Sequence, residues 1–293
     1  MFIEPNEHII IMDQGSNVLM PDELAMLRDA GIKTIYLTNG IKWMRIQPRP
    51  GVWYFEELDA RIEDYEQAGL KAVIGFFGSS MPYWKPWDWF FDGKSPRGHG
   101  FHSYTNPETA AGIDDFAARL IERYRGKRVQ FAYAMPASGE FPTPIPRGAQ
   151  SPILDEDLAA WVVARQKQLE AQYNEVWSAF HFTCCPTYII PTIEALKEAY
   201  PDSAHYSLQY KYFNQPHNVQ AAVVGAQKKY GVQYYVGSEY VQGMKLLAPY
   251  AVQHGVRLLT SPIHSYQPRR RVEPWMLDVI RDTLRLYEEA DGT

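Results

Sequence analysis

The stretch Val129-Gln-Phe-Ala-Tyr-Ala-Met-Pro-Ala-Ser-Gly-Glu-Phe-Pro142 begins as an apolar run and ends in a segment punctuated by Pro and Gly. This pattern predicts a buried strand followed by a loop that carries one carboxylate, that of Glu140. A second stretch of the same kind, Val232-Gln-Tyr-Tyr-Val-Gly-Ser-Glu-Tyr240, has Glu239 just past its strand. Two carboxylates that each follow a strand, far apart in the sequence, indicate a shared site at one end of a parallel barrel.

Strands and helices alternate along the rest of the chain. Besides the two strands above, apolar runs predict strands at 9–12, 33–37, 71–77, 176–183, 204–209 and 256–260. Helices are predicted at about 21–30, 55–68, 107–125, 155–173, 192–200, 219–230, 244–254 and 273–290. These eight alternations, without a composition break, predict an α/β fold, a single (β/α)8 TIM barrel domain that spans residues 1–293. The alternative is a doubly wound open sheet, but no glycine-rich phosphate loop follows the first strand.

Composition limits the class of protein. The chain has 293 residues, of which 46% are hydrophobic and 22% charged, enough to bury a sizeable core. Its net charge of -5 argues against a nucleic acid or an anionic membrane as partner. The sequence shows no basic-then-apolar leader and no apolar run long enough to span a bilayer, so we expect a cytoplasmic protein. Its cysteines, Cys184 and Cys185, are adjacent in an apolar run and are expected to be buried thiols.

A pair of carboxylates at one barrel face suits the cleavage of a glycosidic bond. One carboxyl group holds a proton for the leaving oxygen, and the other attacks or stabilises the oxocarbenium-like carbon. The small neighbours Ser138-Gly139 and Gly237-Ser238 leave room for a substrate. Neither role needs a metal or an organic cofactor, so none is expected. The competing interpretation is that each glutamate caps a helix or is a solvated charge.

Other side chains at the predicted strand ends are candidates for binding a carbohydrate. They are Asp13 and Asn39 for hydroxyl groups, Trp43 and Trp84 for stacking on a sugar face, Gln209 and Tyr210 at the end of the sixth strand, and His264 after the eighth. Five of them have a structural alternative: turn or cap residues for Asp13 and Asn39, core packing for the tryptophans, and a structural role for the histidine.

Three blocks carry a resemblance to a known family: Trp43-Met-Arg-Ile-Gln-Pro-Arg-Pro-Gly-Val-Trp-Tyr-Phe-Glu-Glu-Leu-Asp59, Gly69-Leu-Lys-Ala-Val-Ile74 and Met81-Pro-Tyr-Trp84. They resemble the second and third βα units of the family 42 β-galactosidase-like enzymes, within the clan of retaining (β/α)8-barrel glycosidases. The resemblance implies that Glu140 is the general acid/base and Glu239 the nucleophile.

The chain departs from that pattern at two positions. Gly139 stands where the superfamily usually has Asn, and Tyr36 stands where it commonly has Arg on the second strand. The segment Ser138-Gly-Glu-Phe-Pro142 is more similar to the acid loop of the β-amylases, which invert the anomeric centre. The alternatives are therefore a retaining glycosidase and an inverting, β-amylase-like one.

Two further classes remain in view. The missing Asn and Arg partners suit a barrel that binds carbohydrate without cleaving it, because a carboxylate needs its supporting groups to reach a catalytic pKa. A metal-dependent lyase or isomerase is disfavoured, because no His-x-His follows the first strand and no His/carboxylate cluster has ligand spacing.

Overall fold

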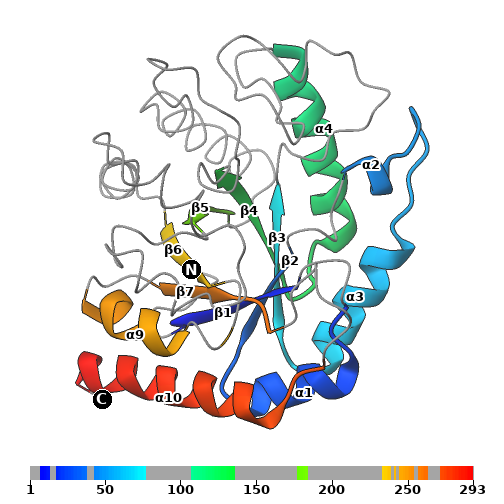
Figure 1. Cartoon of the computed structure of the whole chain (residues 1–293). Helices are drawn as coiled ribbons and strands as arrows, with labels where there is room; N and C mark the ends of the chain where they lie inside the picture. Colours follow the sequence, from blue (N-terminus) through cyan, green and yellow to red (C-terminus); the bar gives the residue numbers. More distant parts are fainter. Residues whose placement is uncertain are drawn as a thin grey trace, which may run out of the picture.

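A barrel of parallel strands forms the centre of the molecule (Figure 1). The computed structural model describes residues 7–13, 18–37, 43–76, 107–135, 177–183, 233–238, 241, 244–253, 257–262 and 271–292. The strands within these residues are β1 (Ile9–Asp13), β2 (Thr34–Leu37), β3 (Lys71–Phe76), β4 (Val129–Met135), β5 (Trp177–Thr183), β6 (Gln233–Ser238) and β7 (Arg257–Thr260). Each strand pairs in parallel with the next, and β1 pairs with β7, so the described strands close on themselves.

The closed parallel barrel confirms the predicted fold class and differs from a doubly wound sheet, whose edge strands stay open. The described strands coincide with predicted ones to within one or two residues. The strand expected at 204–209 lies outside the described residues. β5 and β6, the strands expected to flank it, pair directly with each other, Phe180 with Gln233 and Thr183 with Val236.

The described helices lie to the right of and below the strands in Figure 1. Those described are α1 (Pro21–Asp29), α2 (Trp43–Ile46), α3 (Glu56–Gln67), α4 (Pro107–Tyr124), α9 (Met244–Gln253) and α10 (Pro274–Asp291). All except α2 were predicted; the residues of α2 were expected to form part of a loop. The helices predicted at 155–173, 192–200 and 219–230 lie outside the described residues.

Polar contacts fix where the first and last helices begin. The carboxylate of Glu23 accepts a hydrogen bond from the backbone N–H of Met20 at 2.8 Å, which satisfies a donor at the start of α1. Its other oxygen accepts the N–H of Val272 at 2.9 Å, just before α10. Arg271 also pairs with Asp22. The entrance to α10 is therefore tied to the first turn of α1, and the two helices lie beside each other in Figure 1.

The strand register divides the buried side chains into two sets. One row of paired residues consists of Ile11, Ile35, Ala72 and Val129. This row packs with helix residues such as Leu27, Ile62 and Leu120 in one apolar cluster. The adjacent row consists of Met12, Tyr36, Val73 and Gln130, all buried but outside that cluster. Because successive strand residues point to opposite faces, the first row faces the helices and the second faces the barrel interior.

None of the described helices is both long and apolar enough to cross a membrane.

Candidate active site

Two strands lead toward the predicted catalytic glutamates at the same end of the barrel. β4 ends at Met135, five residues before Glu140, and β6 ends at Ser238, directly before Glu239. Because all the described strands are parallel, their carboxyl ends open onto one face, which hosts the active site in barrels of this kind. Both glutamates lie outside the described residues.

The same holds for most of the predicted substrate-binding residues. Those outside the described residues are Asn39, Trp84, Gln209, Tyr210 and His264. Two strand ends nevertheless lead toward members of this group: β2 ends at Leu37, two residues before Asn39, and β7 ends at Thr260, four residues before His264. Asp13 and Trp43 are the predicted site residues whose surroundings the structure describes.

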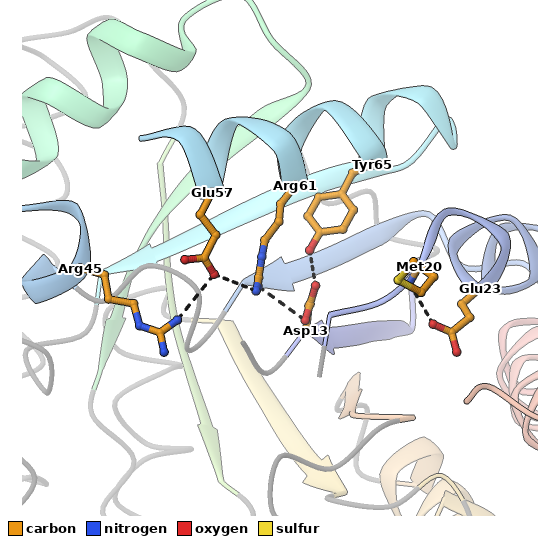
Figure 2. A network of polar contacts seen from close by, with 7 residues as sticks. All are labelled: Asp13, Met20, Glu23, Arg45, Glu57, Arg61 and Tyr65. Carbon is orange, nitrogen blue, oxygen red and sulfur yellow. Dashed lines mark hydrogen bonds and ion pairs between the residues drawn. The ribbon is translucent and has the colours of Figure 1, made fainter. Parts of the chain in front are cut away.

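Asp13 is the last residue of β1, and its side chain is completely buried. The hydroxyl of Tyr65 donates a hydrogen bond to one carboxylate oxygen, and Nη1 of Arg61 lies 3.8 Å from the other (Figure 2). The backbone N–H of Leu19 also donates to this carboxylate. Asp13 thus joins the end of β1 to helix α3 and to the segment that precedes α1.

Burial dominates the electrostatics of this group. It raises the pKa of Asp13 above its ordinary value, while the charge of Arg61 and the hydrogen bonds from Tyr65 and Leu19 act in the opposite direction. Burial, with the Asp13 carboxylate beside it, raises the pKa of Tyr65 well above its usual value. Tyr65 therefore remains a neutral hydroxyl donor over the whole pH range in which the protein would work.

A line of alternating charges continues from Asp13 toward the surface. Arg61 is itself buried, with its side chain 4% exposed, and its Nη2 donates to Oε1 of Glu57 at 3.2 Å. The same oxygen of Glu57 lies 3.5 Å from Nη1 of Arg45, a residue of α2. Glu57 and Arg45 are both about half exposed. Figure 2 shows this line running from the strand end, across α3, to α2.

The position of Asp13 differs from the expectation that it binds sugar hydroxyls directly. Asp13 shares the face of β1 that carries Ile9 and Ile11, both members of the helix-facing cluster. Its carboxylate therefore lies between the strand and helix layers, and it would have to leave Tyr65 and Arg61 to reach a ligand.

The partners of Asp13 were not predicted from the sequence. Glu57, Arg61 and Tyr65 are spaced by four residues, so they form one stripe along α3. A polar stripe of this kind on a helix that must cover a strand layer is the signal that would have revealed them.

Trp43 also has a different environment from the one expected. It is 4% exposed, its ring stacks on Phe116 of α4 with centroids 5.1 Å apart, and its Nε1 donates to Oε1 of Gln47 at 2.8 Å. The structural alternative, core packing, therefore describes Trp43 better than an exposed platform for a sugar.

Trp43 belongs to a larger aromatic group that joins α2, α3 and α4. Trp53 stacks on both Phe116 and Phe55, at 6.2 and 6.1 Å between centroids. The guanidinium of Arg119 lies 4.5 Å from the centre of the Trp53 ring. Stacked rings and a covering cation stabilise the group beyond its buried area.

A clasp between α3 and α4 adjoins these rings. Arg123 contacts both oxygens of Asp59, with Nε 2.7 Å from Oδ1, and the hydroxyl of Tyr124 donates to Oδ1 at 2.9 Å. The hydrogen bond from Arg123 holds the pKa of Asp59 below its usual value. This clasp fixes α4 against α3 on the side away from Asp13.

The described part of the chain contains no candidate metal site. Within it, no group of three or more His, Cys, Asp or Glu side chains is arranged to hold an ion.

Comparison with known proteins supports the glycosidase resemblance in part of the chain. The glycoside hydrolase family 42 model, described as β-galactosidase, matches residues 11–86. This match confirms the resemblance, because it spans the blocks 43–59, 69–74 and 81–84 that carry it. A search of curated protein sequences finds no match.

Solved structures of glycosidases share the fold. A β-galactosidase from the Antarctic haloarchaeon Halorubrum lacusprofundi aligns with a TM-score of 0.62 at 14% identity, covering 98% of this chain and 58% of that one. The catalytic domain of a β-amylase from Paenibacillus polymyxa aligns at 0.59 and 11% identity, over 97% and 99% of the two chains. A glycoside hydrolase family 5 enzyme from Prevotella bryantii B14 aligns with a TM-score of 0.52 at 11% identity, covering 96% of each chain.

At these identities the structural likeness concerns the fold alone. The chain has the TIM-barrel architecture of these glycoside hydrolases, and it spans less than two thirds of the haloarchaeal β-galactosidase.

Proposed function

We propose that the protein is a glycoside hydrolase that cleaves a β-linked glycoside or oligosaccharide with two glutamates. Glu140 acts as general acid/base and Glu239 as nucleophile, so the configuration at the anomeric carbon is retained. The observation that carries the proposal is the match of residues 11–86 to the β-galactosidase family model, in a chain whose strands β4 and β6 both end shortly before these glutamates.

The strand register supports a shared site. Met135 at the end of β4 and Tyr234 of β6 both pair with His181 of β5, so the three residues form one row. Glu140 and Glu239 each stand five residues beyond that row along the sequence. Because the two glutamates follow the same row by the same number of residues, their carboxylates are expected at a similar height above the barrel.

The proposed mechanism has two steps. The protonated Glu140 gives its proton to the glycosidic oxygen as the bond to the anomeric carbon breaks, and the carboxylate of Glu239 forms a covalent glycosyl ester. Glu140, now ionised, takes a proton from water, which attacks the anomeric carbon and releases Glu239. Each glutamate ends in the state in which it began.

The remaining predicted residues are assigned to substrate binding. We propose that Asn39, Trp84, Gln209, Tyr210 and His264 contact the carbohydrate from the loops that follow their strands. For Asp13 and Trp43 we propose supporting roles, because both are buried and held by neighbouring side chains. The single catalytic domain over residues 1–293 is part of the same proposal.

An inverting hydrolase is the second candidate. The segment Ser138–Pro142 resembles the acid loop of β-amylases, and a β-amylase catalytic domain is among the structures with the same fold. In that case Glu239 acts as a base on water. Retaining carboxyl pairs lie ~5–5.5 Å apart and inverting pairs ~6.5–9.5 Å apart, which leaves room for the water.

The test is cleavage of a panel of aryl β-glycosides, with the anomer of the first product followed by NMR. Release of the β-anomer is expected; the α-anomer would establish the inverting alternative. Glu140→Gln and Glu239→Gln are each expected to lower kcat by roughly 10²–10⁴-fold. Glu63→Gln, at an exposed carboxylate on α3, is the matched control and should leave kcat unchanged.

Absence of cleavage across the panel, together with measurable sugar binding by calorimetry, would instead favour the carbohydrate-binding barrel. Full activity in Glu239→Gln would refute its assignment as nucleophile.

A further inference from the structure

We propose that Asp13, Arg61 and Tyr65 form a positioning group for the substrate site. These three side chains hold two of the connections at the carboxyl end of the barrel in place. The inference rests on the proposed function for what those connections bind, and on the contacts below for how they are held.

The first connection is the one that leaves β1. It starts at Asp13, and the chain is again described from Val18 onward. The Asp13 carboxylate accepts the backbone N–H of Leu19, so one side chain links both ends of this short connection. This contact joins the end of β1 to the described segment before α1.

The second connection runs from β2 to α3 and contains α2. It is reached through Arg61, which lies 3.8 Å from Asp13 and 3.2 Å from Glu57. Glu57 in turn lies 3.5 Å from Arg45 of α2. The first connection is therefore tied to the buried Asp13 by a hydrogen bond, and the second is tied to it through three successive ion pairs (Figure 2).

The chemistry of the group argues for positioning rather than for stability alone. A buried ion pair loses its hydration, and well-packed apolar side chains in its place often give a fold that is as stable or more so. The rest of α3 packs in that apolar way, through Leu58 and Ile62. What the charged group adds is a set of directional bonds between particular atoms, located where a barrel enzyme binds its substrate.

The same helix offers a matched control. Asp59 of α3 is also held by an arginine and a tyrosine, Arg123 and Tyr124, but both come from α4. Asp59→Asn thus weakens an equivalent clasp on α3 without touching the connection after β1. Asp13→Asn keeps the shape of the side chain and an oxygen that accepts from Tyr65, and removes the charge that faces Arg61.

The first measurement is steady-state kinetics on an aryl β-glycoside that the wild type cleaves. Asp13→Asn is expected to raise KM by about 10-fold with kcat changed less than about twofold, because the binding loops are displaced while the reacting groups remain. Asp59→Asn is expected to lower Tm by less than Asp13→Asn does, because Asp59 and Arg123 are partly exposed, and to leave KM unchanged. Equal effects of the two variants on KM, or an unchanged KM in Asp13→Asn, would overturn the proposal.

The second measurement does not depend on activity. Amide hydrogen exchange at residues 18–20 and 43–46 is expected to be at least about 10-fold faster in Asp13→Asn than in the wild type, and unchanged in Asp59→Asn. Unchanged exchange in Asp13→Asn would refute the positioning role. If the wild type cleaves no glycoside, the proposed function fails, and the exchange result still decides the role of this group.

A second variant tests the proposal if Asp13→Asn does not fold. Arg61→Lys keeps the positive charge but not the planar fork that reaches Asp13 and Glu57 together. We expect a smaller rise in KM and in exchange than with Asp13→Asn. An exchange pattern identical to that of the wild type would count against the proposal.

Discussion

Acidic side chains are buried near both ends of β1, with different partners. Glu7, two residues before the strand, pairs with Lys71 and accepts a hydrogen bond from Thr34, and these two residues begin β3 and β2. Asp13, at the other end of the strand, pairs with residues of a helix. The first group ties strands to one another at the amino end of the barrel, and the second ties a strand to the helix layer at the carboxyl end.

Removing the hydroxyl of Tyr65 tests the cost of leaving the Asp13 carboxylate with fewer donors. Tyr65→Phe is expected to lower the free energy of unfolding by about 1–3 kcal/mol, since a buried charged acceptor loses a hydrogen bond. Urea denaturation is the measurement. Tyr54→Phe, at an exposed tyrosine, is the control and is expected to change stability by less than ~0.5 kcal/mol. Equal effects of the two variants would contradict the importance of this bond.

His8 provides a prediction about pH. Its ring stacks on Tyr287 with centroids 4.5 Å apart, and its Nε2 lies 3.2 Å from Asp291. Burial lowers its pKa below 6.5 and outweighs the attraction of Asp291 and Glu288, while Arg257 and Lys33 act in the same direction as burial. As the pH falls, His8 therefore takes up a proton in the unfolded chain before it does so in the folded protein. The contribution of His8 to stability is present above pH 6.5, and it is lost as the pH falls through the lower pKa of the folded state.

The matching variant is His8→Phe, which keeps an aromatic ring against Tyr287 and does not titrate. Denaturation at pH 7.5 and at more acidic values is expected to show a shallower loss of stability in the variant than in the wild type. The other titrating groups contribute to both proteins, so the difference between the two curves isolates His8. Parallel curves would show that His8 does not contribute to the pH dependence.

Aromatic packing joins α4 to the elements beside it. Phe116 of α4 lies between Trp43 of α2 and Trp53 of the segment before α3, and contacts both rings. One side chain thus joins three consecutive pieces of the structure. Its loss would leave a cavity that the surrounding rings fill only in part.

Phe116→Ala is expected to lower the free energy of unfolding by about 3–5 kcal/mol, the usual range for a buried aromatic side chain. The near-ultraviolet circular dichroism of the stacked tryptophans is expected to weaken with it. Phe116→Leu should cost less, because more of the volume is kept. A loss no greater than that of Leu286→Ala, at an exposed position on α10, would contradict the packing described here.

Elements with strong periodic or apolar signals were predictable from the sequence. The strands at the centre of the barrel are short apolar runs, and α1, α3 and α10 begin or end at Pro and Gly, so their existence and approximate bounds follow from local patterns. Helix α2 was missed because it is a single turn followed closely by Pro48 and Pro50, where local propensity favours a loop.

The surroundings of the site residues were less predictable. Ile9-Ile-Ile-Met12 is apolar at every position, as is usual in a strand covered on both faces, so the sequence gives no alternation from which to infer that Asp13 faces the helices. The contact of Trp43 with Phe116 joins residues from different helices, and sequence spacing alone does not predict such contacts. The assignments of Glu140 and Glu239 stay predictions.

Across the whole molecule, the two ends of the barrel are expected to respond differently to mutation. The carboxyl end carries the proposed site, whereas residues at the amino end serve stability in barrels of this kind. The buried group of Glu7, Thr34 and Lys71 allows a test at the amino end.

Lys71→Met removes the ammonium group that pairs with the buried Glu7 and is expected to cost about 3–5 kcal/mol of stability while leaving KM unchanged. The double variant Glu7→Gln/Lys71→Met removes both charges and is expected to be more stable than Lys71→Met alone. Denaturation of the two variants and the wild type measures the difference. A double variant less stable than the single one would show that the remaining partners, rather than the ion pair, govern this region.

The pairing of Ile9 with Leu258 has a consequence for how the protein is made. During synthesis β1 is made well before its second neighbour, β7, because the two strands are far apart in the sequence. Until then one edge of β1 has unpaired N–H and C=O groups, the kind of edge that recruits other strands. Contacts so distant in the sequence also slow folding. The described barrel therefore cannot close until β7 has been made, and nascent chains that stop short of β7 expose this edge to aggregation.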